Sequence, residues 1–244
     1  MSTKKVALIT GANKGIGLET ARQLGKQGIT ILVGARDERR GSEAVKTLQA
    51  EGVDAQFLHM DMSDATTFTN AAKFIGDKFG KLDILINNAG VLMDYGVAVS
   101  ASPLASWRAT FETNVFAVVE LTQALLPLVK KSDAGRIVNL TSILASLTLN
   151  SDPSSPIGPS VPTHTSYNAS KAALNMFTVH LAAELKDTKI KVNAAHPGWV
   201  KTDMGGAEAP MELVDGAKTS VALATLGEDG PTGAYIHMGE ALPW

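Results

Sequence analysis

Residues 5–17 read KVALITGANKGIG, a short apolar run that leads into a glycine-rich stretch. The pattern predicts a buried strand from Lys5 to Thr10, a tight turn, and a helix from Leu18 to Gln27. Glycines allow the backbone of such a turn to approach a pyrophosphate, and the first N–H groups of the helix face the anion. A glycine-rich turn that only packs against its neighbours is the plainer alternative. The residues predicted to contact a dinucleotide are Gly11, Asn13, Lys14, Gly15, Ile16 and Gly17.

A second predicted strand, Ile29 to Ala35, indicates which dinucleotide the turn would bind. Strands at this position usually end at an acidic residue that hydrogen-bonds the ribose 2′-hydroxyl. Here the strand ends at alanine and is followed by Arg36, which could pair with a 2′-phosphate together with Lys14. Asp37 carries the opposite charge, but an aspartate also suits the start of the helix that follows. We therefore expect NADP(H) as the cofactor, with a solvated loop charge as the alternative for Arg36.

Strand and helix patterns alternate along the rest of the chain. Short apolar, β-branched runs predict buried strands, and longer segments with apolar residues three and four apart predict helices. Regular alternation is typical of a parallel sheet covered on both faces. We therefore expect an α/β fold, a doubly wound parallel sheet of the Rossmann type, in a single domain covering residues 1–244. The predicted strands span residues 55–60, 82–87, 135–141, 189–196 and 233–237, and the predicted helices span residues 38–50, 65–79, 104–130, 166–185 and 211–226.

Polar residues follow three of these strands, at the edge of the sheet where ligands bind in such folds. Asp61 and Met62 follow the strand at 55–60, and the Asp61 carboxylate could accept a hydrogen bond from an adenine amino group. Asn87 ends the next strand, where a side chain that bridges neighbouring strands explains it at least as well as ligand contact. Ser142 follows the strand at 135–141. The segment after Asn87 adds three further predicted cofactor contacts, Asn88, Ala89 and Gly90.

Tyr167 and Lys171 form the motif in which we expect the chemistry. Residues four apart on a helix share one face, and apolar positions continue the stripe, so both polar groups should point toward the core. An ammonium beside a phenol favours the phenolate, so the pair could act as acid or base near neutral pH. The alternative is a structural tyrosine and a lysine that extends to solvent. Asn114 lies in the apolar stripe of the 104–130 helix and must also be satisfied, by the core or by water that leads to a functional group.

Composition excludes several other classes of function. The chain has 244 residues, of which 45% are hydrophobic and 19% charged, and its net charge of -2 gives no reason to expect a nucleic-acid partner. No apolar run approaches the roughly 20 residues of a membrane helix, and we expect no signal peptide. Cysteine is absent, which excludes disulfides, cysteine-ligated zinc and thiol catalysis and fits a cytoplasmic protein. We expect neither a membrane partner nor a metal.

Two segments differ from the regular pattern and are predicted to lie near a substrate. Between residues 150 and 165, proline recurs at every third position among Ser, Gly and Thr, at Pro153, Pro156, Pro159 and Pro162. A flap over the site is the expected role of this proline-rich segment, and the polyproline II period leaves a ligand for an SH3-type domain as the alternative. The segment 203–226, above all its first part up to Val214, is a candidate substrate lid because such segments often become ordered on binding.

Taken in order, the motifs resemble those of the short-chain dehydrogenase/reductase family, and within it those of NADPH-dependent carbonyl reductases. The resemblance implies that Tyr167 donates a proton to a carbonyl oxygen and that Ser142 hydrogen-bonds the same oxygen. Lys171 would hold the nicotinamide ribose and lower the tyrosine pKa, and Asn114 would position a water that passes protons to Lys171. It also implies cofactor contacts from Pro197, Gly198, Val200 and Thr202, although a threonine there could instead cap a turn. The matching residues cover essentially the whole chain and are Thr10-Gly11-xxx-Gly15-Ile16-Gly17, Asp61, Asn87-Asn88-Ala89-Gly90, Asn114, Ser142, Tyr167-xxx-Lys171 and Pro197-Gly198.

The function implied is reversible hydride transfer that reduces a ketone or aldehyde to an alcohol with NADPH. Two alternatives remain, a 3-oxoacyl carrier-protein reductase, which should need an electropositive patch at the site mouth, and a non-catalytic NADP(H) sensor or partner-binding module on the same fold. Ser142 and Tyr167 are 25 positions apart, roughly twice the separation in most of the family, and the proline-rich segment accounts for the excess. The expected partner is a small-molecule carbonyl substrate. The oligomeric state is left open, with a monomer or dimer favoured over a tetramer.

Overall fold

The computed structural model describes residues 4–158 and 164–244, which are built around one eight-stranded sheet. Its strands are β1 (Val6–Thr10), β2 (Thr30–Ala35), β3 (Ala55–His59), β4 (Ile84–Asn87), β5 (Arg136–Leu140), β6 (Lys191–Ala195), β7 (Tyr235–His237) and β8 (Glu240–Ala241). The order in the sheet is β3-β2-β1-β4-β5-β6-β7-β8, and all neighbours are parallel except β7 and β8. The order reverses between β1 and β4, which confirms the predicted doubly wound fold.

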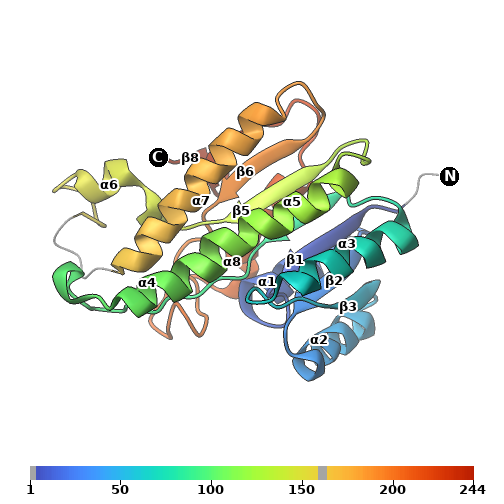
Figure 1. The fold of residues 1–244 in the computed structure, drawn as a ribbon, viewed down its shortest axis with the longest axis horizontal. Helices are drawn as coiled ribbons and strands as arrows, with labels where there is room; N and C mark the ends of the chain where they lie inside the picture. The colour runs from blue at the N-terminus through green and yellow to red at the C-terminus, as the bar shows by residue number, and fades with distance from the viewer. Residues whose placement is uncertain (1–3, 159–163) are drawn as a thin grey trace.

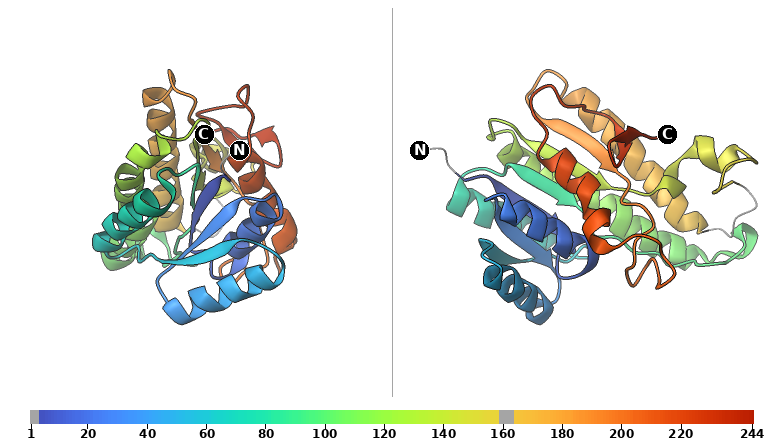
Figure 2. Two further views of the ribbon diagram at one scale, coloured as in Figure 1. Left: turned by 90° about the vertical axis from the view of Figure 1, so that its right-hand side faces the viewer. Right: turned by 180° about the vertical axis from the view of Figure 1, so that it is seen from behind.

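Helices cover both faces of the sheet. One face carries α3 (Ala65–Phe79), α5 (Ala117–Val129) and α7 (Thr165–Glu184), which lie toward the viewer in Figure 1. The other face carries α1 (Gly15–Lys26), α2 (Glu38–Ala50) and α8 (Leu213–Ala224), and the right-hand view of Figure 2 shows α1 and α8 from that side. Successive strand residues serve opposite layers, because Leu8 packs in the first core cluster and Ile9 in the second.

Local capping explains where the second and third helices begin. The Asp37 carboxylate accepts a hydrogen bond from the Arg40 N–H at 2.8 Å, and this bond lowers the Asp37 pKa. Asp64 does the same for α3 by accepting from the Thr66 N–H at 3.0 Å. Both carboxylates satisfy N–H groups that a helix start leaves without partners. The interpretation of Asp37 as a helix-start residue is therefore confirmed.

The predicted helix 104–130 is not one regular helix. α4 (Leu104–Phe111) continues into the π-helical turn η2 (Glu112–Phe116) before α5 begins. A π turn inserts an extra residue and shifts the side chains away from the regular helical stripe. Asn114 lies in η2 and is fully buried. The sequence did not reveal this turn because apolar residues continue at helical spacing on both sides of it.

The two segments predicted to lie near a substrate are only partly irregular. The short helix α6 (Leu147–Ser151) ends inside the proline-rich segment, residues 152–158 form turns, and residues 159–163 lie outside the described residues. In the predicted lid, residues 213–224 form α8, and its apolar face with Val221 and Leu223 belongs to the core shared with α1. Burying these side chains fixes the helix against the sheet, so this half of the segment does not suit a lid. Residues 203–212 are left as the lid candidate.

Candidate active site

The predicted site residues meet at the carboxyl ends of β1, β4, β5 and β6. The glycine turn follows β1, Asn88 follows β4, Ser142 follows β5, and Pro197 follows β6. Tyr167 and Lys171 lie on α7, which packs alongside β5 and β6. Ligands bind at this edge of parallel sheets, next to the point where the strand order reverses.

The glycine turn after β1 leaves no room for side chains. Gly11 and Gly15 have φ angles of +65° and +58°, in the left-handed region that glycine adopts at little cost. A Cβ on Gly17 would lie 2.5 Å from Asn88 Nδ2 and 2.7 Å from the Gly11 carbonyl oxygen. Lys14 stands at the N-cap of α1 and makes no side-chain capping hydrogen bond there. The turn is therefore a close-fitting backbone cradle whose helix N–H groups suit a phosphate.

Asn88 fastens this cradle to β4. Its Nδ2 donates to the Thr10 carbonyl at 2.7 Å, and the backbone N–H groups of Asn88 and Ala89 both donate to Thr10 Oγ1 at 3.0 Å. Asn87 is structural, because its buried Nδ2 donates to Asn139 Oδ1 of the neighbouring strand at 2.8 Å. The structural interpretation of Asn87 is thus supported, although its partner on the neighbouring strand is the side chain of Asn139 and not the strand backbone. Cofactor contacts of Asn88 and Ala89 stay predictions.

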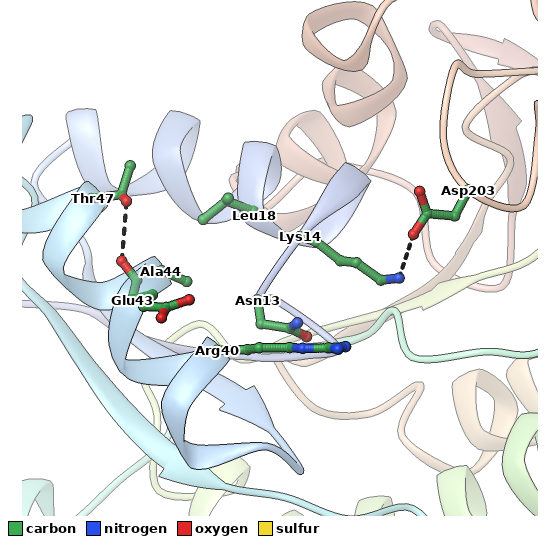
Figure 3. Close-up of a pocket in the computed structure, with 8 residues that line it drawn as sticks. All are labelled: Asn13, Lys14, Leu18, Arg40, Glu43, Ala44, Thr47 and Asp203. Carbon is green, nitrogen blue, oxygen red and sulfur yellow. Dashed lines mark hydrogen bonds and ion pairs between the residues drawn. The ribbon is translucent and has the colours of Figure 1, made fainter. Parts of the chain in front are cut away.

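A pocket beside the glycine turn contains exposed charges of both signs, as Figure 3 shows. Lys14 reaches across its mouth to Asp203, with 2.5 Å between Nζ and Oδ2, and the two side chains are 63% and 82% exposed. Arg40, in the first turn of α2, extends past Asn13 toward this ion pair. The residues that line the pocket are Asn13, Lys14, Leu18, Arg40, Glu43, Ala44, Thr47 and Asp203.

Arg40 is a candidate to which the sequence analysis assigned no contact, although Arg39-Arg40-Gly41 also resembles the NADPH-dependent carbonyl reductases. Arg36, which was predicted to pair with a 2′-phosphate, does not line this pocket, and that role stays a prediction. A signal for Arg40 was available in the sequence. A helix that starts at Asp37 places residue 40 in its first turn, just beyond the end of β2, where this fold binds the dinucleotide ribose.

The Asp61 carboxylate accepts hydrogen bonds from Ser63, two residues further along the same turn. Its Oδ1 accepts from the Ser63 N–H at 2.9 Å and from the Ser63 hydroxyl at 2.7 Å. These bonds, followed by the charge of Arg36, lower the pKa of the Asp61 carboxyl. Two other predicted cofactor contacts, Met62 after Asp61 and Ile16 in the glycine turn, are partly buried and pack against the first and second core clusters, respectively. Asp61 is thus an ionised acceptor at the carboxyl end of β3, and its adenine contact stays a prediction.

Tyr167 and Lys171 share one buried face of α7, as their spacing predicts. Tyr167 is 8% exposed and Lys171 is 4% exposed. The Lys171 ammonium donates to the Leu140 carbonyl oxygen at 2.7 Å, and its Nζ lies 5.7 Å from the centre of the Tyr167 ring. The alternative of a lysine that extends to solvent is therefore wrong.

The pKa values of this pair follow burial rather than mutual attraction. Burial raises the pKa of Tyr167 to about 12, and a hydrogen bond with Ser142 lowers it only in part. Burial also lowers the pKa of Lys171 to about 8. The pKa of Tyr167 therefore shifts opposite to the expected lowering, because a buried phenolate loses its hydration. Tyr167 is a protonated phenol at neutral pH, as a proton donor must be.

Asn114 links η2 to the loop after β4 and to α7. Its Oδ1 accepts from the Val91 N–H at 2.8 Å, and its Nδ2 donates to the Val91 carbonyl at 2.9 Å and to Ser170 Oγ at 3.0 Å. These bonds satisfy the carboxamide within the protein and support a structural role. A Cβ on Gly90 would lie 3.3 Å from Asn114 Oδ1 and 3.4 Å from Lys171 Nζ, so the two groups flank one backbone position. The proton-carrying water stays a prediction.

Ser142 stands at the start of the short turn η3 (Ile143–Ala145). Its Oγ accepts from the Leu144 N–H at 3.3 Å, and its hydroxyl is close enough to Tyr167 to affect the pKa of the phenol. Because the turn uses the hydroxyl oxygen as an acceptor, the hydroxyl proton can be donated, to Tyr167 or to another acceptor beside it. Ser142 and Tyr167 can therefore both donate toward one acceptor placed between them.

The segment after β6 packs against the glycine turn. Gly198 has a φ of +90°, and a Cβ there would lie 2.1 Å from Met211 Sδ. Val200 is buried and forms an isolated parallel bridge with Met211. Thr202 Oγ1 accepts a backbone N–H at 2.9 Å, and its Cγ2 would lie 3.8 Å from a Cβ on Gly15. Thr202 thus caps a turn, as its alternative predicts, and its contact with nicotinamide stays a prediction.

Among residues 4–158 and 164–244, no three His, Asp or Glu side chains are grouped so that they could hold a metal ion. No helix in these ranges is long and apolar enough to cross a membrane.

Known proteins resemble this chain in both sequence and fold. A family model for short chain dehydrogenases matches residues 5–213. The short-chain dehydrogenase anuI of Penicillium roqueforti (strain FM164) is 38% identical over 229 residues, which cover 92% of this chain and 90% of that protein. Carbonyl reductase (NADPH) 1 of Homo sapiens is 33% identical over 277 residues, which cover 98% of each chain. The crystal structure of NADPH-bound carbonyl reductase from chicken fatty liver matches with a TM-score of 0.86 and 27% identity, covering 99% of each chain.

The matched residues 5–213 run from β1 to the start of α8 and contain all four predicted catalytic residues, Asn114, Ser142, Tyr167 and Lys171. The relatives at 31–33% identity over nearly the full chain include several carbonyl reductases, which confirms the resemblance found in the motifs. This chain belongs to the short-chain dehydrogenase family.

Proposed function

We propose that this protein uses NADPH to reduce a ketone or aldehyde carbonyl to an alcohol. The observation that carries the proposal is the buried, protonated Tyr167 beside Ser142 and Lys171, at the sheet edge where the glycine turn opens. A phenol and a hydroxyl that donate to one point suit the negative charge that develops on a carbonyl oxygen. Family membership and the relatives named carbonyl reductase support an oxidoreductase that acts on CH–OH or C=O groups.

The glycine turn fits a dinucleotide. Gly17 and Gly11 admit no side chain, so the uncapped N–H groups of α1 are left for a pyrophosphate. Asp61 would bind the adenine, and the segments 88–90 and 197–202 would hold the nicotinamide half. When bound there, NADPH supplies the hydride.

The chain's own residues would handle the proton. Tyr167 donates its phenolic proton to the carbonyl oxygen, and the Ser142 hydroxyl stabilises the same oxygen by a second hydrogen bond. Lys171 has N–H groups beyond the one bound to Leu140, and these would hold the nicotinamide ribose hydroxyls. A lysine cation there also stabilises the phenolate that Tyr167 becomes after it has given up its proton. Asn114 would fix the position of the loop after β4 relative to these catalytic residues.

We propose a preference for NADPH over NADH. β2 ends at Ala35 without a carboxylate for the ribose 2′-hydroxyl, and Lys14 and Arg40 line the pocket beside it. A 2′-phosphate would take Lys14 from its exposed pairing with Asp203 and would gain charge-assisted bonds to both cations. Arg36 would add a third positive charge near the end of β2.

Two segments would enclose the substrate. Residues 203–212 are the proposed lid, because Asp203 already reaches across to the glycine turn. The proline-rich segment 150–165 is the proposed wall, because it joins the turn that carries Ser142 to the helix that carries Tyr167.

The test is a substrate panel of ketones, aldehydes, quinones and acetoacetyl thioesters, followed by the loss of reduced-nicotinamide absorbance with NADPH and with NADH. We expect turnover of at least one carbonyl class, with NADPH favoured, and loss of that turnover in Tyr167→Phe. A wild-type protein that binds NADPH but reduces none of these compounds would instead favour the non-catalytic sensor.

The 3-oxoacyl carrier-protein alternative needs an electropositive patch at the site mouth. Two lysines in the segments proposed to bind the cofactor are paired with carboxylates, Lys14 with Asp203 and Lys201 with Glu212. This pairing weakens attraction for an acidic carrier protein. Turnover confined to the acetoacetyl thioesters would instead favour the 3-oxoacyl carrier-protein reductase.

A further inference from the structure

Two side chains from the C-terminal part of the chain contact the Ser142–Ile143 peptide bond, and the proposed reaction gives them no role. Tyr235, in β7, donates its hydroxyl to the Ser142 carbonyl oxygen. His196, directly after β6, accepts the Ile143 N–H at its Nδ1, with 3.1 Å between the nitrogens. One peptide bond of the catalytic turn is therefore held at both polar ends by side chains from other strands.

The backbone around Ser142 has little remaining freedom. The Ser142 carbonyl also accepts from the Ala145 N–H at 2.8 Å, so both of its lone pairs are used. On the other side, the Thr141 N–H donates to the Ala195 carbonyl of β6 at 2.8 Å. The Ser142–Ile143 peptide is therefore held at both polar ends, and β5 is anchored to β6 one peptide before the Thr141–Ser142 bond. These bonds restrict the backbone that carries the Ser142 side chain, and its hydroxyl then moves mainly by rotation about χ1.

Tyr235 is itself firmly placed. The side chain is buried, and its ring stacks on Trp244 at 5.2 Å between centroids and 24° between planes. The Trp244 carbonyl in turn accepts from the Thr148 N–H at 3.0 Å and from Ser146 Oγ at 3.3 Å. Burial, and then the nearby Tyr167 phenol, raise the pKa of Tyr235, so its hydroxyl keeps the proton that it donates.

His196 is held in the form that accepts a hydrogen bond. Its Nδ1 faces two backbone donors, the Ile143 N–H and, at 3.4 Å, the Gly198 N–H, so this nitrogen carries no proton. Burial and the neighbouring His237 lower the pKa of His196 to about 3, which keeps the ring neutral. The His237 ring packs at 4.7 Å between centroids and donates from Nδ1 to the His196 carbonyl at 2.9 Å. The imidazole thus ties the Ser142 turn to the segment that would hold the nicotinamide.

We propose that Tyr235 and His196 are positioning residues for Ser142, which fix its hydroxyl where it can donate to the carbonyl oxygen of the substrate. The inference rests on the proposed reduction. Neither side chain needs to touch the substrate, so the effect of removing either one must pass through Ser142. A purely structural role would instead change stability without depending on the serine hydroxyl.

A double-mutant cycle separates these two roles. Tyr235→Phe removes one hydroxyl and keeps the ring that stacks on Trp244. We expect kcat to fall roughly tenfold with the NADPH Kd unchanged, and by less than about twofold when Ser142 is already alanine. An equal loss of kcat with and without the Ser142 hydroxyl would overturn the proposal.

Thr219→Val is the matched control. Thr219 Oγ1 is buried and accepts from the Met238 N–H at 2.9 Å, in the same part of the fold but away from the Ser142–Ile143 peptide. The variant should lower the free energy of unfolding and leave kcat within about twofold of wild type. A fall in kcat as large as that of Tyr235→Phe would mean that any lost hydrogen bond near β7 has this effect, which contradicts positioning.

His196 gives a test that does not depend on activity. His196→Asn keeps an acceptor near the Nδ1 position and His196→Leu removes it, so amide hydrogen exchange at Ile143 should accelerate in the leucine variant and recover in the asparagine variant. Equal rates of amide hydrogen exchange at Ile143 in wild type and in His196→Leu would contradict the proposal that His196 holds this peptide. If the wild type reduces no carbonyl, the proposed function fails, while this exchange measurement still decides whether His196 holds the peptide.

Discussion

The pocket beside α2 and the catalytic face of α7 use charged and polar groups in opposite ways. At the pocket, Lys14 and Asp203 form an ion pair that is mostly exposed, and Arg40 extends near it. On α7, Tyr167 and Lys171 are almost completely buried, and the lysine is bound to a backbone carbonyl. Lys14 and Arg40 can exchange partners at little cost because water screens them. The groups on α7 cannot, because a buried polar group that loses its partner costs its full desolvation.

This difference assigns separate tasks to the two regions. An exposed cluster can select between cofactors that differ by one phosphate, because such selection needs only a modest, salt-dependent difference in affinity. A buried set can stabilise a transition state, because its dipoles are fixed before the substrate arrives. Changes on α7 should therefore alter turnover or stability strongly, and changes at the pocket should alter cofactor affinity mildly.

Tyr167→Phe should have the largest effect. The variant lacks the only proposed proton donor and keeps the ring, so we expect kcat to fall on the order of 10²-fold or more while the NADPH Kd is unchanged. Steady-state turnover and a fluorescence titration with NADPH measure the two quantities. Ser142→Ala should lose less, since Tyr167 can still protonate the oxygen. Near-normal turnover of Tyr167→Phe would show that the buried face is not where the chemistry occurs.

Lys171→Met tests what burial of the amine costs in stability. Because burial lowers the lysine pKa from 10.5 to about 8, the unfolded chain binds this proton more tightly than the folded one. The resulting destabilisation is complete below pH 8 and disappears as the pH rises from about 8 to 10.5. We expect the variant to unfold at pH 7 with on the order of 1–3 kcal/mol more free energy than wild type, although it should be inactive.

Urea unfolding of both proteins between pH 7 and 10.5 measures this difference, which should shrink as the pH rises. Lys73→Met, at an exposed position of α3, is the control and should show no such trend. A stability gain that grew with pH would contradict the assigned direction of the Lys171 pKa.

Arg40→Ala tests whether the pocket beside α2 binds the 2′-phosphate of NADPH. Loss of one charge-assisted contact should weaken NADPH binding roughly tenfold and change NADH binding by less than about twofold. Arg39→Ala is a close control, because Arg39 is the preceding residue and is also exposed, but it pairs with Glu43 and does not line the pocket. Arg36→Ala, measured in the same way, shows whether the predicted arginine adds to Arg40. Equal losses for NADPH and NADH would mean that Arg40 supports the helix rather than the phosphate.

The sequence predicted the features that depend on local pattern. The glycine turn, the alternation of strands and helices, and the shared face of Tyr167 and Lys171 follow from spacing along a few residues. Asp37 as a helix start follows from one residue type at one position. The class of fold and the edge of the sheet that carries the site can therefore be expected from the sequence alone.

The remaining features depend on contacts between distant parts of the chain. Tyr235 and Ser142 are separated by 93 positions, and no pattern in either segment indicates that they meet. The direction of the Tyr167 pKa also depends on how completely the surrounding elements exclude water, which the spacing of two residues does not specify. The π turn at Asn114 was hidden because apolar residues continue at helical spacing on both sides of it.

Asp203→Asn should have the smallest effect on cofactor affinity, and its salt dependence tests whether the pocket beside α2 acts through exposed charge. In the absence of cofactor Asp203 holds Lys14, and it would also repel a 2′-phosphate, so its charge opposes NADPH in two ways. Removing the charge should tighten NADPH binding about two- to fivefold at low salt and leave NADH unchanged, which is the scale of an exposed ion pair. Asp215→Asn, which breaks an exposed pair with Lys218 on α8, should change the affinity for neither cofactor. Because exposed charges are screened over roughly 3 Å at molar salt, the gain in NADPH affinity of Asp203→Asn should vanish at that salt concentration. The kcat loss of Tyr167→Phe should persist. A gain in NADPH affinity that survives molar salt would mean that the Lys14–Asp203 pair acts through the shape of the 203–212 segment and not through charge. Weaker NADPH binding in Asp203→Asn would instead make Asp203 part of a lid that closes over the bound cofactor.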